Sequence, residues 1–166
     1  MNRAFFLLGA ATCAALLGFA YYLQYVQGLE PCPLCLVQRA FFYAVLGTFA
    51  LGAIHAPKRG GNAVYGGLAA LFAVGGVVTA GRQVWLQHLP ADKVPACGPD
   101  LYFMLQNFPL QQALTRLFAG SGECAVVDWT FLGLSIAEWS LAWFGALVVY
   151  ALWLALRGTR SPVAAA

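Results

Sequence analysis

Two cysteines separated by two residues, Cys32 and Cys35, lie in the stretch PCPLCLVQR, just before a long apolar segment. Such a pair can form a structural disulfide, contribute to a metal site, or work as a redox-active dithiol. A disulfide closing so short a loop removes little chain entropy, and a zinc site normally needs a second close pair. We therefore favour redox exchange, because C-x-x-C spacing lowers a thiol pKa and eases cycling between dithiol and disulfide.

The residues after Cys32 predict a helix that begins at Pro33, since proline suits the first helical position. Cys35 then lies in the first turn, where free N–H groups and the helix dipole stabilise a thiolate. Arg39 follows Cys35 by four residues and shares its helical face. Snorkelling to the interface is one interpretation of Arg39. We favour a site role, holding a thiolate or the carbonyl oxygen of an electron acceptor, because a bare charge within an apolar segment is costly.

Three further cysteines, Cys13, Cys97 and Cys124, complete the set of five. Cys13 lies within the first apolar segment, where we interpret it as a small buried hydrophobe. A structural disulfide between Cys97 and Cys124 would close about 28 residues and stabilise by ~3.6 kcal/mol in the chain-entropy model. Glycine-rich turns flank both cysteines, however, so this disulfide would also be accessible to the thiolate of another protein. No residue set predicts a metal site.

The composition places these cysteines in a membrane protein. Hydrophobic residues make up 61% of the 166-residue chain and charged residues 9%, against about 25% charged in soluble domains. The net charge of +3 is too small and too scattered to indicate nucleic-acid binding. We expect one all-α membrane domain, a four-helix transmembrane bundle, because a span needs ~20 apolar residues. The four segments that meet this are about 4–26, 36–56, 63–86 and 137–157.

Basic residues predict the orientation of the four spans. Those that flank the spans all fall on one side of the membrane: Arg3, Lys58, Arg59, Arg157 and Arg160. This side is predicted to be cytoplasmic, with both termini. Four cysteines then lie on the opposite, oxidising side, in a short turn and in a long loop at about 87–136. A cleaved signal peptide is the alternative for the first segment, disfavoured by its length and its terminal tyrosines.

The long loop is expected to contain short amphipathic helices that lie along the membrane surface. Asp100 is a good N-cap for the first of these helices, and Pro109 suits the first position of the second. Ser135 and Glu138 match a capping box at the start of the last span. His88 is the only histidine on this side. A structural or solvated role is the usual one for a lone histidine, and a proton relay beside Cys35 is the functional alternative.

These motifs together resemble the DsbB family of bacterial disulfide bond formation proteins. The resemblance rests on P-C-x-x-C-x-x-x-R at the second span, on S-G-E-C-A at the end of the loop, and on W-x-F-L-G-L from Trp129 to Leu134. It covers nearly the whole chain. It implies a thiol:quinone oxidoreductase of the bacterial inner membrane that re-oxidises a periplasmic, DsbA-like oxidant of thioredoxin fold.

The resemblance also implies a role for each site residue. Cys97 would be attacked by the thiolate of the oxidant, and Cys124 would resolve the mixed disulfide by exchange. Electrons would pass to the Cys32–Cys35 pair, and Cys35 would deliver them to a ubiquinone or menaquinone held near Arg39. His88 falls near the quinone region of the family, in a stretch that is shorter here than in some members.

Other functions fit parts of the pattern. A membrane thiol reductant would need cysteines reachable from the cytoplasm, and the sequence places none there. An oxidase like vitamin K epoxide reductase is disfavoured because C-x-x-C comes late in the chain of such oxidases, whereas here it comes early. A non-enzymatic four-span scaffold with two structural disulfides is the alternative outside enzymes.

Overall fold

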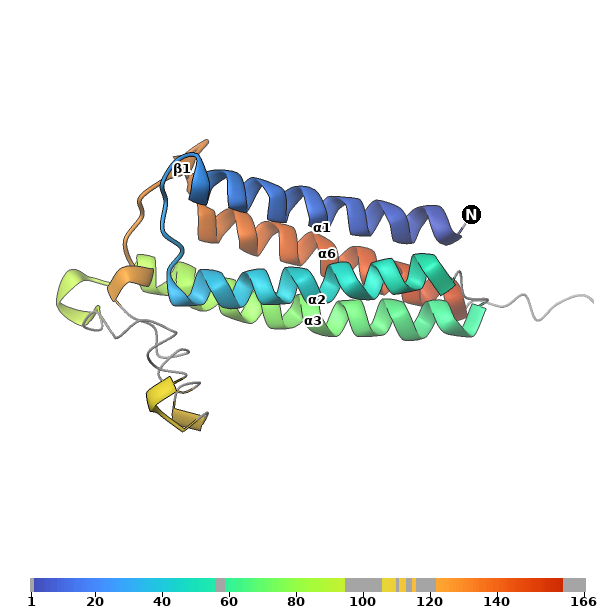
Figure 1. Cartoon of the computed structure of the whole chain (residues 1–166). Helices are drawn as coiled ribbons and strands as arrows, with labels where there is room; N and C mark the ends of the chain where they lie inside the picture. Colours follow the sequence, from blue (N-terminus) through green and yellow to red (C-terminus); the bar gives the residue numbers. More distant parts are fainter. Residues whose placement is uncertain are drawn as a thin grey trace, which may run out of the picture.

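The computed structural model describes residues 2–55, 59–94, 106–109, 111–112, 115 and 122–159. Four long helices form an up-and-down bundle (Figure 1): α1 (Asn2–Tyr25), α2 (Pro33–His55), α3 (Arg59–Gln87) and α6 (Ile136–Thr159). The short elements lie together at one end of the bundle: η1 (Ala91–Lys93), η2 (Gly122–Cys124), β1 (Thr130–Phe131) and β2 (Leu134–Ser135). We call this end the cysteine end, and the end at which the N-terminus lies the terminal end.

All four helices are long and apolar enough to cross a membrane: Arg3–Tyr25, Pro33–His55, Gly60–Gln87 and Ile136–Arg157. The prediction of an all-α, four-helix transmembrane protein is therefore confirmed, and the chain is a multi-pass membrane protein. Two amphipathic helices were predicted, one from Asp100 and one from Pro109. Most of their residues lie outside the described part of the chain. Their prediction stays open.

Helix α3 packs along both α2 and α6, and α2 in turn packs along α1. The contact between α2 and α6 is made by two stacked rings, Phe42 and Phe144, with centroids 4.0 Å apart. Gly76 of α3 makes room for them, since a Cβ there would come within 2.2 Å of the Phe144 ring. A small residue on α3 thus allows the close packing of α6 at this position. Cys13 is fully buried in the same core, as predicted.

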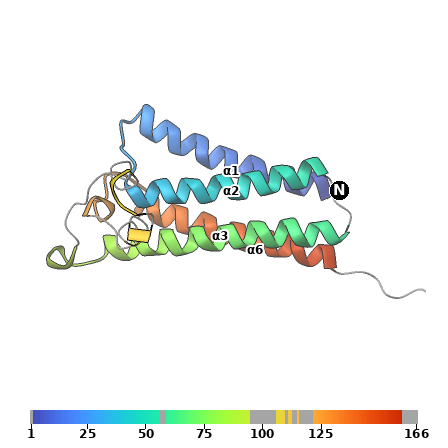
Figure 2. The same cartoon turned by 60° about the horizontal axis from the view of Figure 1, so that its bottom comes forward.

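Helices α1 and α6 touch at the terminal end of the bundle. There the Tyr150 hydroxyl donates to the Phe5 carbonyl over 2.8 Å, and the Phe5 and Trp153 rings meet edge to face at 5.3 Å. Toward the cysteine end α1 tilts away from α2 (Figure 2). The bundle is thus tightest near the termini and widest beside the cysteines.

The start of α6 is fixed by a capping box and by a small hairpin. The Glu138 amide donates to Ser135 Oγ over 3.2 Å, and the Ser135 amide donates to Glu138 Oε2 over 2.7 Å, which confirms the predicted box. Strands β1 and β2 pair through a two-residue turn at Leu132 and Gly133, with φ of 53° and 80°. Two positive φ values suit the twist of a tight hairpin, and glycine supplies the second without strain.

The close approach of α3 to α6 gives a test of the bundle. A Cβ at Gly66 would meet the backbone nitrogen of Ala155 at 2.7 Å and the carbonyl oxygen of Ala151 at 2.8 Å. Backbone atoms cannot rotate away, so we expect Gly66→Ala to lower the free energy of unfolding by about 1–3 kcal/mol. Thermal unfolding in detergent micelles should show a lower Tm. The matched control is Gly67→Ala, where a Cβ meets open space; an equal loss in both variants would contradict this packing.

Candidate functional site: a dithiol beside a membrane cavity

Cys32 and Cys35 lie at the first turn of α2, which begins at Pro33 as predicted. The Cys32 carbonyl accepts the first helical hydrogen bond, from the Leu36 amide at 3.1 Å, so Cys32 occupies the cap position. The two sulfur atoms are 3.1 Å apart. This geometry brings the pair close enough for one disulfide to open and close without movement of the helix.

The structure brings a third cysteine to this pair. Cys124 is fully buried in a small cluster with Leu34 and Leu86, against which Cys32 packs. The cluster joins η2 to the ends of α2 and α3. Hydrogen bonds to Cys124 and Cys35, together with burial, raise the pKa of the Cys32 thiol above its ordinary value. Of the four cysteines predicted to act, three therefore lie together, and Cys97 lies outside the described residues.

Two buried glutamines lie beside the dithiol, one in contact with the sulfur atoms and one bonded to the first, and sequence reasoning did not identify them. Gln83 of α3 donates from Nε2 to Cys35 Sγ at 3.3 Å and to Cys32 Sγ at 3.4 Å. Its Oε1 accepts from Gln38 Nε2 at 2.6 Å. Both side chains are almost fully buried. The sequence signal that could have identified them is an uncharged amide inside an apolar span, at the membrane level of Cys35.

Arg39 extends from α2 toward α1. Its Nη1 donates to Gln24 Oε1, and its Nη2 donates to the Ala20 carbonyl over 3.1 Å. The guanidinium also lies over the Tyr21 ring at 5.0 Å. These contacts stabilise a cation at a depth where it has little access to water. A guanidinium has five N–H donors, so donors remain for a group in the neighbouring space.

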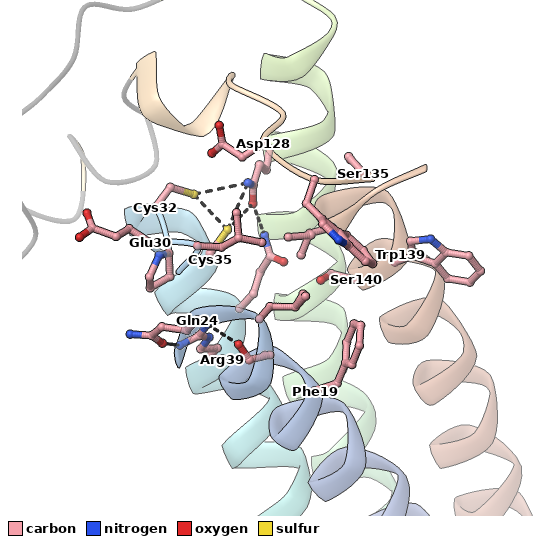
Figure 3. Close-up of a pocket in the computed structure, with 18 of the residues that line it drawn as sticks. Phe19, Gln24, Glu30, Cys32, Cys35, Arg39, Asp128, Ser135, Trp139 and Ser140 are labelled. Atoms are coloured by element: carbon pink, nitrogen blue, oxygen red, sulfur yellow. Dashed lines mark hydrogen bonds between the residues drawn. The ribbon is translucent and has the colours of Figure 1, made fainter. Parts of the chain in front are cut away.

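A cavity of about 1050 Å³ lies beside the dithiol. Figure 3 shows Cys35 and Arg39 together with Phe19 of α1 and Trp139 and Ser140 of α6 around it. Its walls are largely aromatic and aliphatic, and all four long helices contribute to them. The cavity lies at the wide end of the bundle, where a Phe19–Trp129 ring contact at 6.0 Å joins α1 to the segment before α6.

His88 takes a different position from the other candidates. Its Nδ1 lies 2.8 Å from the Val84 carbonyl, its side chain is exposed, and it does not line the cavity. The structure thus brings Cys32, Cys35, Cys124 and Arg39 to one place and leaves His88 beside it. A proton-relay role for His88 stays a prediction.

The fold and the site together define a class: a multi-pass membrane protein with three cysteines gathered at one end of its bundle. Comparison with known proteins agrees. The family model described as "Disulfide bond formation protein DsbB" matches residues 2–154, and the chain belongs to this family.

Several curated relatives carry the name "Disulfide bond formation protein B". The protein from Azoarcus sp. (strain BH72) is 52% identical over 92% of this chain and 92% of its own length. That from Hahella chejuensis is 51% identical over 90% of this chain and 92% of its own. That from Chromobacterium violaceum is 46% identical over 96% of both chains. The resemblance found in the sequence is thereby confirmed, and with it the class of membrane proteins that form disulfide bonds.

The raised pKa of Cys32 predicts its reactivity. The thiolate is the form that iodoacetamide modifies, so in the fully reduced protein we expect Cys32 to react only at a higher pH than an ordinary thiol. Cys124→Ala removes the largest cause and should move the pH profile of Cys32 down by on the order of one unit. Mass spectrometry of Cys32 modification as a function of pH measures the profile in the wild type and in Cys124→Ala. Cys13→Ala is the control, and an unmoved profile in Cys124→Ala would argue against the contact.

Proposed function

We propose that this protein is a thiol:quinone oxidoreductase of the bacterial inner membrane. It re-oxidises a periplasmic, DsbA-like oxidant of thioredoxin fold and passes two electrons to a ubiquinone or menaquinone of the membrane pool. The observation that carries this proposal is the position of Cys35, which is both half of a close dithiol and part of the wall of a large apolar cavity at membrane depth. A purely structural disulfide gains nothing from such a neighbour.

The cavity fits a quinone in size and in chemistry. Its volume, about 1050 Å³, lies just above the ~300–1,000 Å³ that is usual for small-molecule sites. The walls are mainly apolar and aromatic, which suits a flat ring, and they also contain glutamine, serine and carboxylate side chains beside Arg39. Of the polar groups, Arg39 donates N–H bonds and would hold a carbonyl oxygen. When bound, a quinone supplies an acceptor for two electrons and two protons.

The contact between Cys124 and Cys32 supports exchange between the two cysteine pairs. In the proposed sequence, attack of the oxidant's thiolate on Cys97 breaks a Cys97–Cys124 disulfide and leaves Cys124 as a thiolate, which then attacks Cys32 Sγ. A Cys32–Cys124 bond forms, the Cys32–Cys35 bond breaks, and its electron pair stays on Cys35. Cys97 takes the earlier role of accepting the thiolate of the soluble oxidant. Over the full cycle the oxidant's dithiol loses two electrons and two protons, and the quinone gains both.

An external electron acceptor is also required by the energetics of the proposed partner. A DsbA-like disulfide has a reduction potential near −120 mV, about 60 mV above that of protein disulfide isomerase, and 30 mV corresponds to ~1.4 kcal/mol for two electrons. Ordinary structural disulfides, which lie below about −300 mV, cannot regenerate so strong an oxidant. A quinone in the bilayer can reach the wide end of this bundle and meet this need.

The first test of the proposal is Cys35→Ser. We expect purified protein in detergent to reduce a soluble ubiquinone analogue in the presence of a reduced DsbA-like dithiol protein. Cys35→Ser should reduce this rate by at least about a thousandfold, because removal of a covalent catalytic group is rarely compensated. Cys13→Ala, which replaces a buried cysteine outside the site, should keep the wild-type rate. A full rate in Cys35→Ser would favour the scaffold with structural disulfides.

A second test concerns Arg39. We expect Arg39→Ala to raise the apparent KM for the quinone by about tenfold or more, the value of one lost charged hydrogen bond. Single-turnover oxidation of the dithiol partner should persist in this variant. Arg82→Ala is the matched control, since Arg82 also lies within a span but stacks on the Trp85 ring at 4.2 Å and does not line the cavity. An equal rise in KM in both variants would speak against Arg39 as the contact to the acceptor.

A further inference from the structure

Among the described residues, Gln83 has an amide that is within hydrogen-bond distance of both sulfur atoms of the dithiol. Nε2 lies 3.3 Å from Cys35 Sγ and 3.4 Å from Cys32 Sγ. The side chain is 4% exposed and reaches the cysteines from α3, across the interface with α2. A primary amide buried in an apolar bundle costs free energy unless its donors and acceptor are used. Here the sulfur atoms are the partners of its N–H groups.

The orientation of this amide is fixed by a second glutamine. Gln38 Nε2 donates to Gln83 Oε1 at 2.6 Å, and Gln38 is 3% exposed. Because Oε1 of Gln83 accepts this bond, its NH₂ group faces the sulfur atoms. The Cys35 thiol also lies 3.5 Å from Oε1, so in the protonated state it has an acceptor there. The arrangement therefore serves Cys35 both as a thiol and as a thiolate.

An N–H donor beside a sulfur atom favours the anion over the thiol, since hydrogen bonds to charged acceptors are roughly twice as strong as neutral ones. In the part of the chain that the structure describes, the other titratable or charged groups around the site are the Cys32 and Cys124 thiols and the side chains of Glu30, Arg39, Glu123 and Asp128. Arg39 is the cation among them, and it is bonded to Gln24 and Ala20 of α1. Gln83 is thus the neutral donor that contacts the sulfur directly.

We propose that Gln83 is a further catalytic residue of the dithiol site, one that stabilises the thiolate on Cys35, and that Gln38 positions its amide. The inference rests on the proposed function, in which the Cys32–Cys35 bond opens under attack at Cys32 and its electron pair stays on Cys35. A better leaving thiolate speeds disulfide exchange. Because Nε2 contacts both sulfur atoms, the same donor can follow the negative charge if Cys32 is the sulfur that leaves.

The test is the pH profile of Cys35 alkylation in the reduced, full-length protein in detergent micelles. Iodoacetamide is the reagent, and mass spectrometry identifies the modified cysteine. Gln83→Met keeps an unbranched side chain of similar length but removes both donors. We expect it to move the Cys35 profile to higher pH by on the order of one unit. Gln38→Met should cause a smaller shift in the same direction, because it only releases the amide.

Gln87→Met is the matched control. Gln87 lies one turn further along α3 and lines the same cavity, but its Oε1 accepts from Ser135 Oγ at 2.8 Å. Gln87→Met should leave the pH profile of Cys35 alkylation unchanged. An unshifted profile in Gln83→Met, or an equal shift in Gln87→Met, would overturn the role of Gln83. If Gln83→Met does not fold, as judged by its Tm, the profile of Gln38→Met decides, and no shift there overturns the proposal.

This measurement needs neither quinone nor partner protein. A wild-type protein that fails to reduce a quinone would overturn the proposed function while the alkylation profiles still report on Gln83. Quinone reduction by the wild type with no shift in Gln83→Met would overturn the further inference alone. The two outcomes are therefore distinguishable.

Discussion

The exclusion of water from the bilayer is the constraint on which the site depends. Inside hydrocarbon every polar group must find its partner within the protein, and the cysteine end of the bundle meets this demand in pairs. Arg39 of α2 bonds to Gln24 of α1, and Gln38 of α2 bonds to Gln83 of α3. Each pair joins two helices, so the groups that surround the dithiol also hold the helices at the distance that the dithiol requires.

The apolar part of the structure follows from the same constraint. With lipid on the outside, helix association depends on close packing rather than on hydrophobic burial alone. The small residues of α3 supply that packing against α6, and the stacked rings of Phe42 and Phe144 join α2 to α6. At the terminal end, α1 is also held to α6 by the Phe5–Trp153 and Tyr150–Phe5 contacts. The wider end leaves space next to Cys35, in the cavity that this residue lines.

Much of this arrangement was predictable from local sequence patterns. Four apolar segments, the proline at the start of α2, and the Ser135–Glu138 box each depend on residues that are near neighbours in the chain, and each was confirmed. The helical periodicity also predicted that Cys35 and Arg39 share a face. The candidate site was predictable to the extent that it lies on one helix.

The rest depends on how the helices are rotated against one another, which periodicity does not determine in an apolar chain. Gln83 is 48 positions from Cys35 along the chain, so its contact with Cys35 Sγ exists only after α2 and α3 have packed. Gln24 as the partner of Arg39 and Cys124 as the neighbour of Cys32 are of the same kind. An uncharged amide is also a weaker indicator of a functional site in a sequence than an ionisable group, although in hydrocarbon it too needs a hydrogen-bond partner.

The small hairpin before α6 has a geometric consequence for Cys124. Only residues 125–129 separate Cys124 from β1, and the hairpin is tied to α6 by the bond from Trp139 Nε1 to the Phe131 carbonyl. A fully extended chain spans at most about 3.6 Å per residue, so on this side Cys124 is tethered within roughly 20 Å of a fixed point. The hairpin therefore limits how far Cys124 can move away from Cys32.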